Sequence, residues 1–387
     1  MPDALSARDI LARLVSFPTV SRDSNLELVD WVERYLADLG VSAHRVPSPC
    51  GNKASLFAHI GPEEEGGVIL SGHSDVVPVD GQAWSSDPWC LMEREGRLYG
   101  RGTCDMKGFV ALALAAVPLA LQANLRRPLQ IALSYDEELG CLGAPPMIAH
   151  MASLLPRAAA VVVGEPSMMK AVNGHKGGIA FDIHMRGYEV HSSILHRGVS
   201  AIMEGARLID WANQQNAANR ARTPAAMAAL FDPPFTTIHV GTISGGTAAN
   251  ITARECRFGI DFRCVPGETV EHWSAALHER AAALEAEMKE IRPEAGIEIT
   301  RRFLLPPLVP EPEGAAERLV RKLTGDNATH VVSYGTEAGQ FQAEGYSAIV
   351  CGPGDIAQAH QPDEYITVAQ FEAGWAFMER LVQELSQ

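Results

Sequence analysis

Residues 68–78 read VILSGHSDVVP, an apolar run followed at once by two chemically reactive side chains, His73 and Asp75. Similar apolar runs occur at residues 129–134 (LQIALS) and 159–163 (AAVVV), and longer stretches with helical spacing or helix-forming composition lie between the runs. Apolar runs of this length are typical of strands buried on both faces, and their alternation with helices is typical of a parallel sheet. The sequence therefore predicts an α/β domain with a mostly parallel sheet.

The pattern of the sequence changes near Gly174. The alternating segment GGIAFDIHMRG (177–187) predicts a half-buried strand, and a helical stretch, two further strand-like segments and an Ala- and Glu-rich helix follow it. Strands and helices in this order are typical of an α+β sandwich. We therefore expect residues 174–292 to form an inserted α+β domain. Residues 1–173 and 293–387 are expected to form the α/β domain.

The composition limits the partners of the chain. Its 387 residues include 32 Lys and Arg against 47 Asp and Glu, which gives a formal net charge of −15. Such a surplus of negative charge repels phosphate backbones and anionic lipids, so we expect neither nucleic acid nor a membrane as a partner. The longest apolar run, residues 109–121, is too short to span a bilayer and contains Pro118.

The N-terminal segment and the cysteines bear on localisation. Residues 1–20 lack a basic region followed by an apolar core, and they predict an amphipathic helix rather than a secretory signal. The seven cysteines are scattered, odd in number and never spaced as CxxC. That pattern is typical of free thiols in a reducing compartment. We therefore expect a cytoplasmic protein.

Acidic and histidine side chains repeatedly follow the ends of the apolar runs. They are His73 and Asp75, then Asp136, Glu137 and Glu138, then Glu165, and finally His360, with Asp105 in the Gly-rich loop GRGTCDMKG. In open α/β sheets, sites form outside the carboxyl ends of the parallel strands, so these side chains are expected to meet in one cleft. Imidazole and carboxylate groups are ligands of catalytic zinc, and one carboxylate often bridges two ions. The residues alone thus favour a hydrolytic metal site.

Two local features refine this hypothesis. His73 and Asp75 share one face of an extended chain, so Asp75 can hydrogen-bond the imidazole of His73 and fix its tautomer. In the pair Glu137–Glu138, one carboxylate can bind metal while the other acts as general base. Taken alone, a single histidine or a glutamate pair more often has an ordinary structural role. Neither a GxxxxGK[ST] phosphate loop nor a GxSxG serine-hydrolase motif is present.

Five motifs, in order along the chain, carry a family resemblance. They are SGHSDVVP (71–78), GRGTCDMKG (100–108), SYDEELG (134–140), GEPS (164–167) and AHQPDEY (359–365). Together they resemble the M20 family of dinuclear zinc peptidases and deacylases, over nearly the whole chain. HKGGI (175–179), YGTEAGQF (334–341) and VCGPGDIAQAHQPDEY (350–365) are similar to the acetylornithine deacetylase branch of that family. The resemblance implies a zinc-hydrolase catalytic domain, an inserted lid and dimerisation domain, and hence a homodimer.

The resemblance also implies a role for each residue of the metal site. The implied ligands are Asp105, which bridges two ions, with His73 and Glu165 at one ion and Glu138 and His360 at the other. The ions are expected to be Zn²⁺, for which Co²⁺ can substitute because it accepts the same ligands. Glu137 matches the general base of the family, and Asp75 matches its orienting aspartate.

The resemblance also singles out residues that face the substrate. His191 matches a histidine that reaches into the active site of the partner subunit and helps to stabilise the tetrahedral oxyanion. Asn250, Gly335 and Thr336 match positions that line the substrate pocket. We expect these residues to act on the substrate rather than on the metals.

The substrate expected from this resemblance is N²-acetyl-L-ornithine, hydrolysed to L-ornithine and acetate in arginine biosynthesis. An acidic protein suits the positive side chain of this substrate, and Lys176 or Arg263 is expected to hold its α-carboxylate. Three other activities of the family stay open, namely succinyl-diaminopimelate desuccinylase, aminoacylase and carboxypeptidase. A catalytically silent metal-binding dimer is the alternative from a different class.

Overall fold

The computed structural model of the protein describes residues 5–387. The predicted amphipathic helix near the N-terminus is α1 (Ala7–Val15), which begins after Ser6. The side chain of Ser6 accepts a hydrogen bond from the backbone N–H of Asp9, as expected of a helix N-cap. The part of that prediction that concerns residues 1–4 lies outside the described residues.

The chain divides into two compact units. Unit 1 comprises the chain up to Gly174 together with Leu308–Val331 and Thr336–Gln387, and unit 2 comprises His175–Pro307 and Val332–Gly335. Within the described residues, no helix is both long and apolar enough to cross a membrane.

Unit 1 is built on an eight-stranded sheet with the order β1-β2-β6-β3-β7-β15-β8-β14. The strands are β1 (Ala43–Pro47), β2 (Ala54–Ile60), β3 (Val68–His73), β6 (Leu129–Ser134), β7 (Ala160–Pro166), β8 (Val172–His175), β14 (His330–Val332) and β15 (Ala348–Gly352). The four central strands β6, β3, β7 and β15 pair in parallel, whereas β1, β2 and β8 pair antiparallel with their neighbours. The predicted α/β fold with a mostly parallel sheet is confirmed, with the parallel strands at its centre.

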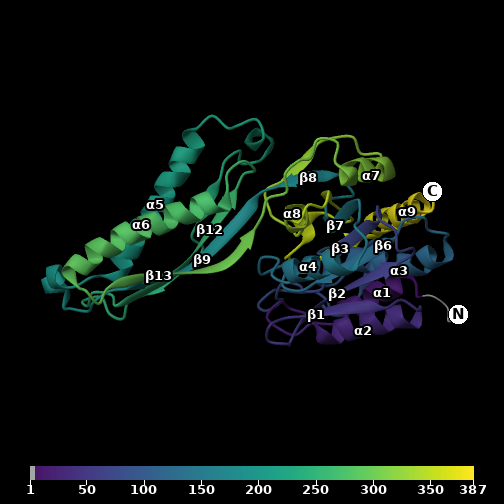
Figure 1. Ribbon diagram of the computed structural model, residues 1–387. Helices are drawn as coiled ribbons and strands as arrows, with labels where there is room; N and C mark the ends of the chain where they lie inside the picture. Colours follow the sequence, from purple (N-terminus) through teal and green to yellow (C-terminus); the bar gives the residue numbers. More distant parts are fainter. Residues whose placement is uncertain (1–4) are drawn as a thin grey trace. The chain divides into compact units, whose positions relative to one another are not determined.

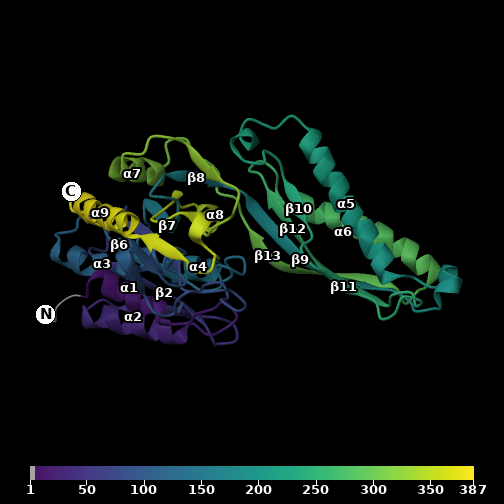
Figure 2. The same cartoon turned by 180° about the vertical axis from the view of Figure 1, so that it is seen from behind.

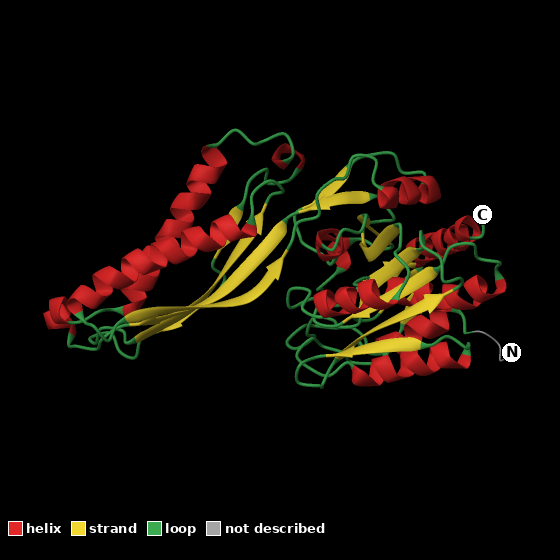
Figure 3. Ribbon diagram, in the orientation of Figure 1, coloured by secondary structure: helices red, strands yellow, loops and turns green. Residues whose placement is uncertain are grey.

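Helices cover both faces of this sheet (Figures 1 and 2). Those that share a core with one face are α1, α2 (Leu26–Asp38), α3 (Lys107–Gln122), α7 (Ala315–Thr324) and α9 (Val368–Leu385). Against the other face pack α4 (Ala144–Leu154) and the short α8 (Ala338–Ala343), and a 3₁₀ turn, η3 (Ile356–Gln358), follows β15. Figure 3 shows the resulting three layers of unit 1, helices, strands and helices.

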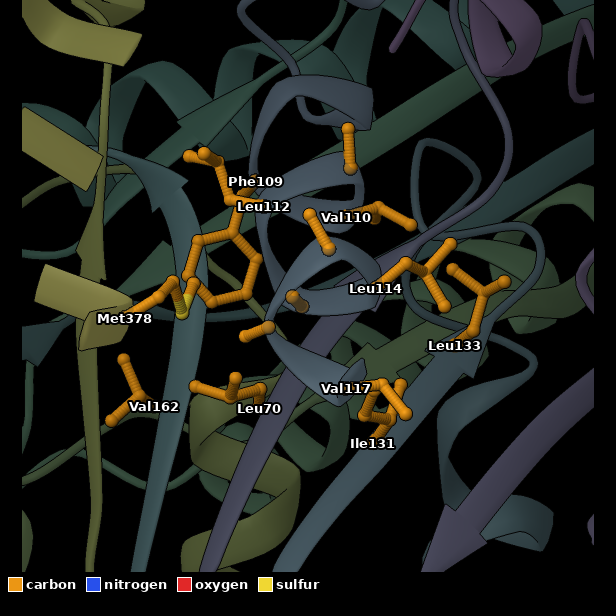
Figure 4. Close-up of a cluster of buried hydrophobic side chains, with 14 of the residues drawn as sticks. Leu70, Phe109, Val110, Leu112, Leu114, Val117, Ile131, Leu133, Val162 and Met378 are labelled. Carbon is orange, nitrogen blue, oxygen red and sulfur yellow. The ribbon is translucent and has the colours of Figure 1, made fainter. Parts of the chain in front are cut away.

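Helix α3 lies at the centre of the core of unit 1. It is apolar on nearly every side because it is covered by the sheet and by the helices α1 and α9. Figure 4 shows Phe109 and Leu112 of α3 beside Leu70 and Met378, which come from the sheet and from α9. A Cβ added at Gly164 would lie 2.0 Å from the ring of Phe109, so only glycine lets α3 approach the end of β7 this closely.

A small three-stranded sheet also belongs to unit 1. It consists of β4 (Met92–Arg94), β5 (Arg97–Tyr99) and β16 (Tyr365–Thr367), in the order β16-β5-β4. Strands β16 and β5 are antiparallel, with Tyr365 opposite Tyr99. The pairing brings the segment before Tyr365 and the segment after Tyr99 side by side, although they are far apart in sequence.

Unit 2 is an antiparallel sheet covered on one face by two long helices (Figure 3). Its strands are β9 (Gly177–Arg186), β10 (Thr237–His239), β11 (Ile243–Gly245), β12 (Glu255–Cys264) and β13 (Gly296–Leu305). Its helices are α5 (Ala201–Ala221) and α6 (Val270–Ile291), with 3₁₀ turns η1 (Ser192–Arg197) and η2 (Ala228–Leu230). Alternate residues of β9 and β12 are buried against α5 and α6, which gives this unit a hydrophobic core of its own.

The strand pairing moves one edge of the expected insertion. The expected boundary at residue 292 falls before β13, and β13 pairs with β9 along most of its length. That boundary is therefore too early, because β13 belongs to the sheet of unit 2. The sequence pattern missed β13 because its apolar alternation is short: Ile297 and Ile299 pack on the core of unit 2, Arg301 and Arg302 then interrupt the pattern, and only two of the ten residues are buried.

Candidate metal centre

The candidate metal ligands lie at or beyond the carboxyl ends of the parallel strands. His73 is the last residue of β3, and Glu137 and Glu138 follow β6. Glu165 lies near the end of β7, and His360 lies in the loop after β15. Because the carboxyl ends of parallel strands lie at one edge of a sheet, this topology brings the side chains together.

Asp105 lies at the centre of the cluster, in the loop that precedes α3. Its Oδ1 lies 3.1 Å from Nε2 of His73, and its Oδ2 lies 3.3 Å from Nε2 of His360. Oε1 of Glu165 is 3.7 Å from Nε2 of His73, and Oε2 of Glu138 is 3.1 Å from Nε2 of His360. The two oxygens of one carboxylate thus face two different histidine–glutamate pairs, which is the arrangement that a carboxylate bridging two ions requires.

Glu137 borders the same cluster. Ligand atoms of His73, Glu137 and Glu165 lie within 4.8 Å of one another, and so do those of His73, Asp105 and Glu138. His73 belongs to both groups. The resemblance implied Asp105 beside His73 and Glu165, whereas the first group has Glu137 there. A carboxylate in this position is close enough to act on a water molecule held at the cluster.

The chemistry of these donors fits divalent zinc or cobalt. Two imidazoles and several carboxylates are the ligand types that these ions accept. Oε1 of Glu165 is buried and has no hydrogen-bond partner among residues 5–387. Because a buried carboxylate oxygen without a partner is costly, a cation at this position would stabilise the site.

The carboxylates of the cluster are crowded and poor in positive charge. Burial raises the pKa of Glu137 to about 8, although His73 opposes the shift. Burial likewise raises the pKa of Glu165 well above its ordinary value. Burial would also raise the pKa of Asp105, but hydrogen bonds from His360 and His73 hold it well below its usual range. Divalent cations would favour the ionised form of all three carboxylates.

The same contacts favour protonated histidines. Hydrogen bonds to Asp105 and Glu138 raise the pKa of His360 to about 10. Burial lowers the pKa of His73, but the hydrogen bond to Asp105 and the charge of Glu165 outweigh burial and raise the pKa well above its ordinary value. Because only a neutral imidazole binds metal, metal binding has to displace these protons.

The orientation of His73 is set by a backbone carbonyl. Nδ1 of His73 donates a hydrogen bond to the carbonyl oxygen of Asp75 at 2.8 Å, whereas Oδ1 of Asp75 lies 3.7 Å from Nδ1. The carboxylate of Asp75 instead accepts hydrogen bonds from Oγ of Ser21 (2.6 Å) and from the backbone N–H of Glu137 (3.1 Å). This corrects the predicted role of the carboxylate: Asp75 fixes the tautomer of His73 through its carbonyl and holds the Glu137 loop through its side chain.

Two buried residues that the sequence analysis did not select support the strand ends. Nζ of Lys53 donates a hydrogen bond to Oδ1 of Asp136 at 2.5 Å, next to Glu137. Glu337 accepts hydrogen bonds from Oγ of Ser71 and Ser134, near the ends of β3 and β6, and burial raises its pKa to about 7. Glu337 lies within the quoted motif YGTEAGQF, but Lys53 carries no signal of this kind in the sequence.

In unit 2, His191 and Asn250 lie close together and are exposed. The backbone carbonyl of Asn250 accepts a hydrogen bond from the N–H of Ser192 at 2.9 Å, and His191 pairs with Ile251 in a single β-bridge. Nδ1 of His191 accepts a hydrogen bond from the backbone N–H of Ser193 at 3.2 Å. In the neutral ring the proton is then on Nε2, which suits a donor to an oxyanion.

The structure corrects the role expected of Lys176. This residue is buried, and its ammonium donates hydrogen bonds to the backbone carbonyls of Pro233 (2.7 Å) and Phe235 (3.1 Å). Burial lowers its pKa to about 8. Because Lys176 is only 1% exposed and two carbonyl groups of its own unit hold its ammonium, it supports the fold of unit 2 rather than facing a substrate carboxylate.

The remaining substrate candidates differ in accessibility. The Arg263 side chain is 41% exposed, and its Nε donates a hydrogen bond to Oδ1 of Asp261 at 3.0 Å. Gly335 is half-buried. Thr336 is fully buried, and its Oγ1 accepts a hydrogen bond from the backbone N–H of Ala338 at 3.1 Å. Of the two cations considered from the sequence, Arg263 is therefore the one that offers donors at the surface.

Comparison with known proteins agrees with the motifs. The model of peptidase family M20/M25/M40 matches residues 69–384. The chain is 36% identical to an acetylornithine deacetylase from Myxococcus xanthus, over 99% of this chain and 98% of the relative. It is 33% identical to an acetylornithine deacetylase from Proteus mirabilis, over 97% of this chain and 95% of the relative.

Solved structures share the fold over the whole chain. An M20 family metallo-carboxypeptidase from Sulfolobus solfataricus matches with a TM-score of 0.77 and 17% identity, over 99% of both chains. A dinuclear metal-binding peptidase of the M20 family from Bacillus subtilis matches with a TM-score of 0.63 and 16% identity, over 98% of this chain and 97% of the other. At sequence identities of 16% and 17%, this structural similarity shows that the fold is shared.

Proposed function

The chain belongs to peptidase family M20/M25/M40 and is a metal-dependent hydrolase, and from this premise we propose that it removes the acetyl group from N²-acetyl-L-ornithine. The products are L-ornithine and acetate. The observation that carries the proposal is the Asp105 carboxylate, whose two oxygens face His73 and His360 separately. The two relatives at 33% and 36% identity, both acetylornithine deacetylases, support the choice of substrate.

Two divalent ions per subunit belong to the proposal, with Asp105 bridging them. His73 and Glu165 would hold one ion, and Glu138 and His360 the other. We propose Zn²⁺ as the native ion and Co²⁺ as a functional substitute. When bound, such ions polarise an amide carbonyl and lower the pKa of water.

The remaining chemistry is assigned to side chains. Glu137 takes a proton from the attacking water and later delivers it to the leaving nitrogen. Its position supports this role, because the hydrogen bond from its backbone N–H to Asp75 fixes the loop on which it lies. His191 donates a hydrogen bond from Nε2 to the oxyanion that develops during attack. The hydrogen bond from the N–H of Ser193 to Nδ1 of His191 supports that tautomer.

We propose that His191 acts in the active site of the partner subunit of a homodimer formed through unit 2. The exposed apolar side chains Ile194, Leu195 and Ile251, next to His191 in the chain or in its β-bridge, support an interface there.

Arg263 is proposed to hold the α-carboxylate of the substrate, with Asn250, Gly335 and Thr336 lining the pocket. Lys176 is no longer part of this set, since backbone carbonyls hold its ammonium. The net charge of −15 favours a substrate whose far end is an ammonium group.

The proposal extends to the place of the enzyme in the cell. Ornithine is the product, so a role in arginine biosynthesis follows from the proposed substrate. The seven cysteines are all free thiols, which supports the reducing cytoplasm as its location.

The test is a comparison of kcat/KM for three substrates under one set of metal conditions. N-acetylornithine is expected to be hydrolysed fastest, ahead of N-acetylmethionine and N-succinyl-diaminopimelate. Glu137→Gln, purified in parallel, controls for contaminating hydrolases. A preference of about tenfold or more for the succinylated substrate, roughly 1.4 kcal/mol of transition-state free energy, would exclude the acetylornithine assignment and leave the metal-dependent hydrolase intact.

A further inference from the structure

Two loops that carry candidate metal ligands lie side by side at the strand pair β5–β16. Strand β5 ends at Tyr99 and leads into the loop that bears Asp105, while β16 begins at Tyr365, just after the loop that bears His360. Tyr365 pairs with Tyr99, and the backbone N–H of Gly100 donates a hydrogen bond to the carbonyl of Glu364 at 3.0 Å. The distance between Asp105 and His360 therefore depends on how these two loops are fastened together.

The carboxylate of Glu364 holds these two loops together through hydrogen bonds. Its Oε1 accepts hydrogen bonds from the backbone N–H groups of Cys104 (2.9 Å) and Asp105 (3.0 Å). Its Oε2 accepts hydrogen bonds from the backbone N–H of Gly102 (3.1 Å) and from Nη1 of Arg101 (2.7 Å). Glu364 is only 1% exposed, so water does not compete for these bonds. One buried side chain thus holds the backbone of the Asp105 loop at three amide groups.

Arg101 extends the network to the other loop. It is fully buried, and its Nη1 also donates a hydrogen bond to the carbonyl of Gln361 at 3.3 Å. Its Nη2 donates to Oε1 of Gln82 at 2.5 Å, and Nε2 of Gln82 donates to the carbonyl of His360 at 2.9 Å. His360 has a φ of +62°, a conformation that a non-glycine residue keeps only when its surroundings hold it. The hydrogen bonds that link Glu364, Arg101 and Gln82 to His360 hold this residue in that conformation.

We propose that Glu364 is a positioning residue that sets the separation of Asp105 and His360 and so determines the affinity for the ion held by Asp105, Glu138 and His360. This inference rests on the proposed dinuclear site. The ion held by His73 and Glu165 shares Asp105 with the first ion, but its other two ligands lie on strands β3 and β7, which Glu364 does not touch. Loss of the Glu364 carboxylate is therefore expected to weaken binding of the ion near His360 more than binding of the ion near His73, whereas loss of the fold would weaken both equally.

Glu364→Gln tests this selectivity. The amide has the same shape as the carboxylate, but its NH₂ group faces donors, either Arg101 and Gly102 or Cys104 and Asp105. Zinc titration of the metal-free enzyme is expected to show the affinity for the ion near His360 reduced about 10–100-fold, with a smaller reduction for the ion near His73. In crystals grown at limiting zinc, the anomalous signal beside His360 is expected to fall relative to the signal beside His73. Glu317→Gln, which alters an ion pair with Arg321 elsewhere in unit 1, is the matched control and is expected to leave both affinities unchanged.

Three results would overturn or redirect the inference. If Glu364→Gln binds both ions as the wild type does, or loses both equally, Glu364 does not position His360 selectively. If the wild type itself binds a single ion, the dinuclear proposal fails, and this outcome is visible without any variant. Should Glu364→Gln not fold, Arg101→Lys serves the same test: it keeps the charge but loses the forked contacts to Gln82 and Gln361, and the same selective weakening is expected.

Discussion

The metal cluster of unit 1 and the candidate catalytic surface of unit 2 are built in opposite ways. In unit 1, His73, Asp105 and Glu165 are buried, and neighbouring loops hold the backbone around them through hydrogen bonds. In unit 2, His191 is exposed and its imidazole contacts Ser193, two residues away in its own chain. A metal centre requires fixed geometry before its ions arrive, whereas a group that meets the substrate has to stay accessible. The contrast indicates that changes at the metal ligands of unit 1 act on metal binding, whereas changes at His191 of unit 2 act on turnover alone.

The largest expected effect comes from a matched pair of variants in unit 1. Asp105→Ala removes the carboxylate proposed to bridge the ions, so both metals and all measurable turnover are expected to be lost together. Glu137→Gln removes only the proton carrier, so metal content is expected to stay at the wild-type value while kcat falls about 10²–10⁴-fold. Metal analysis by mass spectrometry and kinetics on the same samples make the comparison. Binding of two ions by Asp105→Ala would contradict the bridging assignment.

A smaller effect is expected in unit 2. His191→Ala removes one oxyanion donor, so kcat for N-acetylornithine is expected to fall about 10²–10³-fold while the metal content stays unchanged. Mixing His191→Ala with Glu137→Gln subunits is expected to restore part of the activity, because one hybrid site then has both groups. If no activity returns after verified subunit exchange, His191 acts within its own subunit.

A stability comparison tests the same contrast. Lys53→Met leaves Asp136 as a buried carboxylate without its cation, so the free energy of unfolding is expected to fall by about 3–5 kcal/mol. Arg302→Ala in unit 2 breaks an exposed pair with Asp182 and is expected to cost about 0–1 kcal/mol. Urea denaturation of both variants gives the two values. Equal losses would show that the Lys53–Asp136 pair is no more important than a surface pair.

Metal binding is expected to release protons. Without metal, the pKa of His360 is raised to about 10, so the ring is protonated at pH 7.5, and only the neutral ring binds an ion. The affinity for metal is therefore expected to rise with pH up to about 10. Calorimetric titrations with zinc in two buffers of different ionisation enthalpy measure the protons released. No release at pH 7.5 would contradict the assignment of His360 as a ligand.

The sequence predicted the architecture of unit 1 better than its supporting contacts. Apolar runs such as residues 68–72 predict parallel strands, and the residue types that follow them predict where ligands gather. In strand β13 the alternation of Ile297 and Ile299 with polar residues ends at Arg301 and Arg302, and the place of this strand in the sheet of unit 2 follows from its pairing with β9.

The errors at the site have one physical cause. Asp75 orients His73 through its backbone carbonyl, and no residue type in the sequence marks a carbonyl as a ligand orienter. Lys176 was expected to face a substrate, but its ammonium is bound to backbone carbonyls that lie far along the chain. Lys53 was missed for the same reason, because its partner Asp136 is distant in sequence. Sequence patterns identify the chemically reactive groups, whereas the contacts that hold them arise from tertiary packing.

The most direct test of the central claim is the location of the bound ions. Crystals of the zinc-loaded enzyme, measured at the zinc absorption edge, are expected to show two anomalous peaks about 3.5–4 Å apart. One peak is expected beside His73 and Glu165 and the other beside Glu138 and His360, with an oxygen of Asp105 coordinating each ion. A single peak, or two peaks that do not share Asp105, would contradict the dinuclear centre.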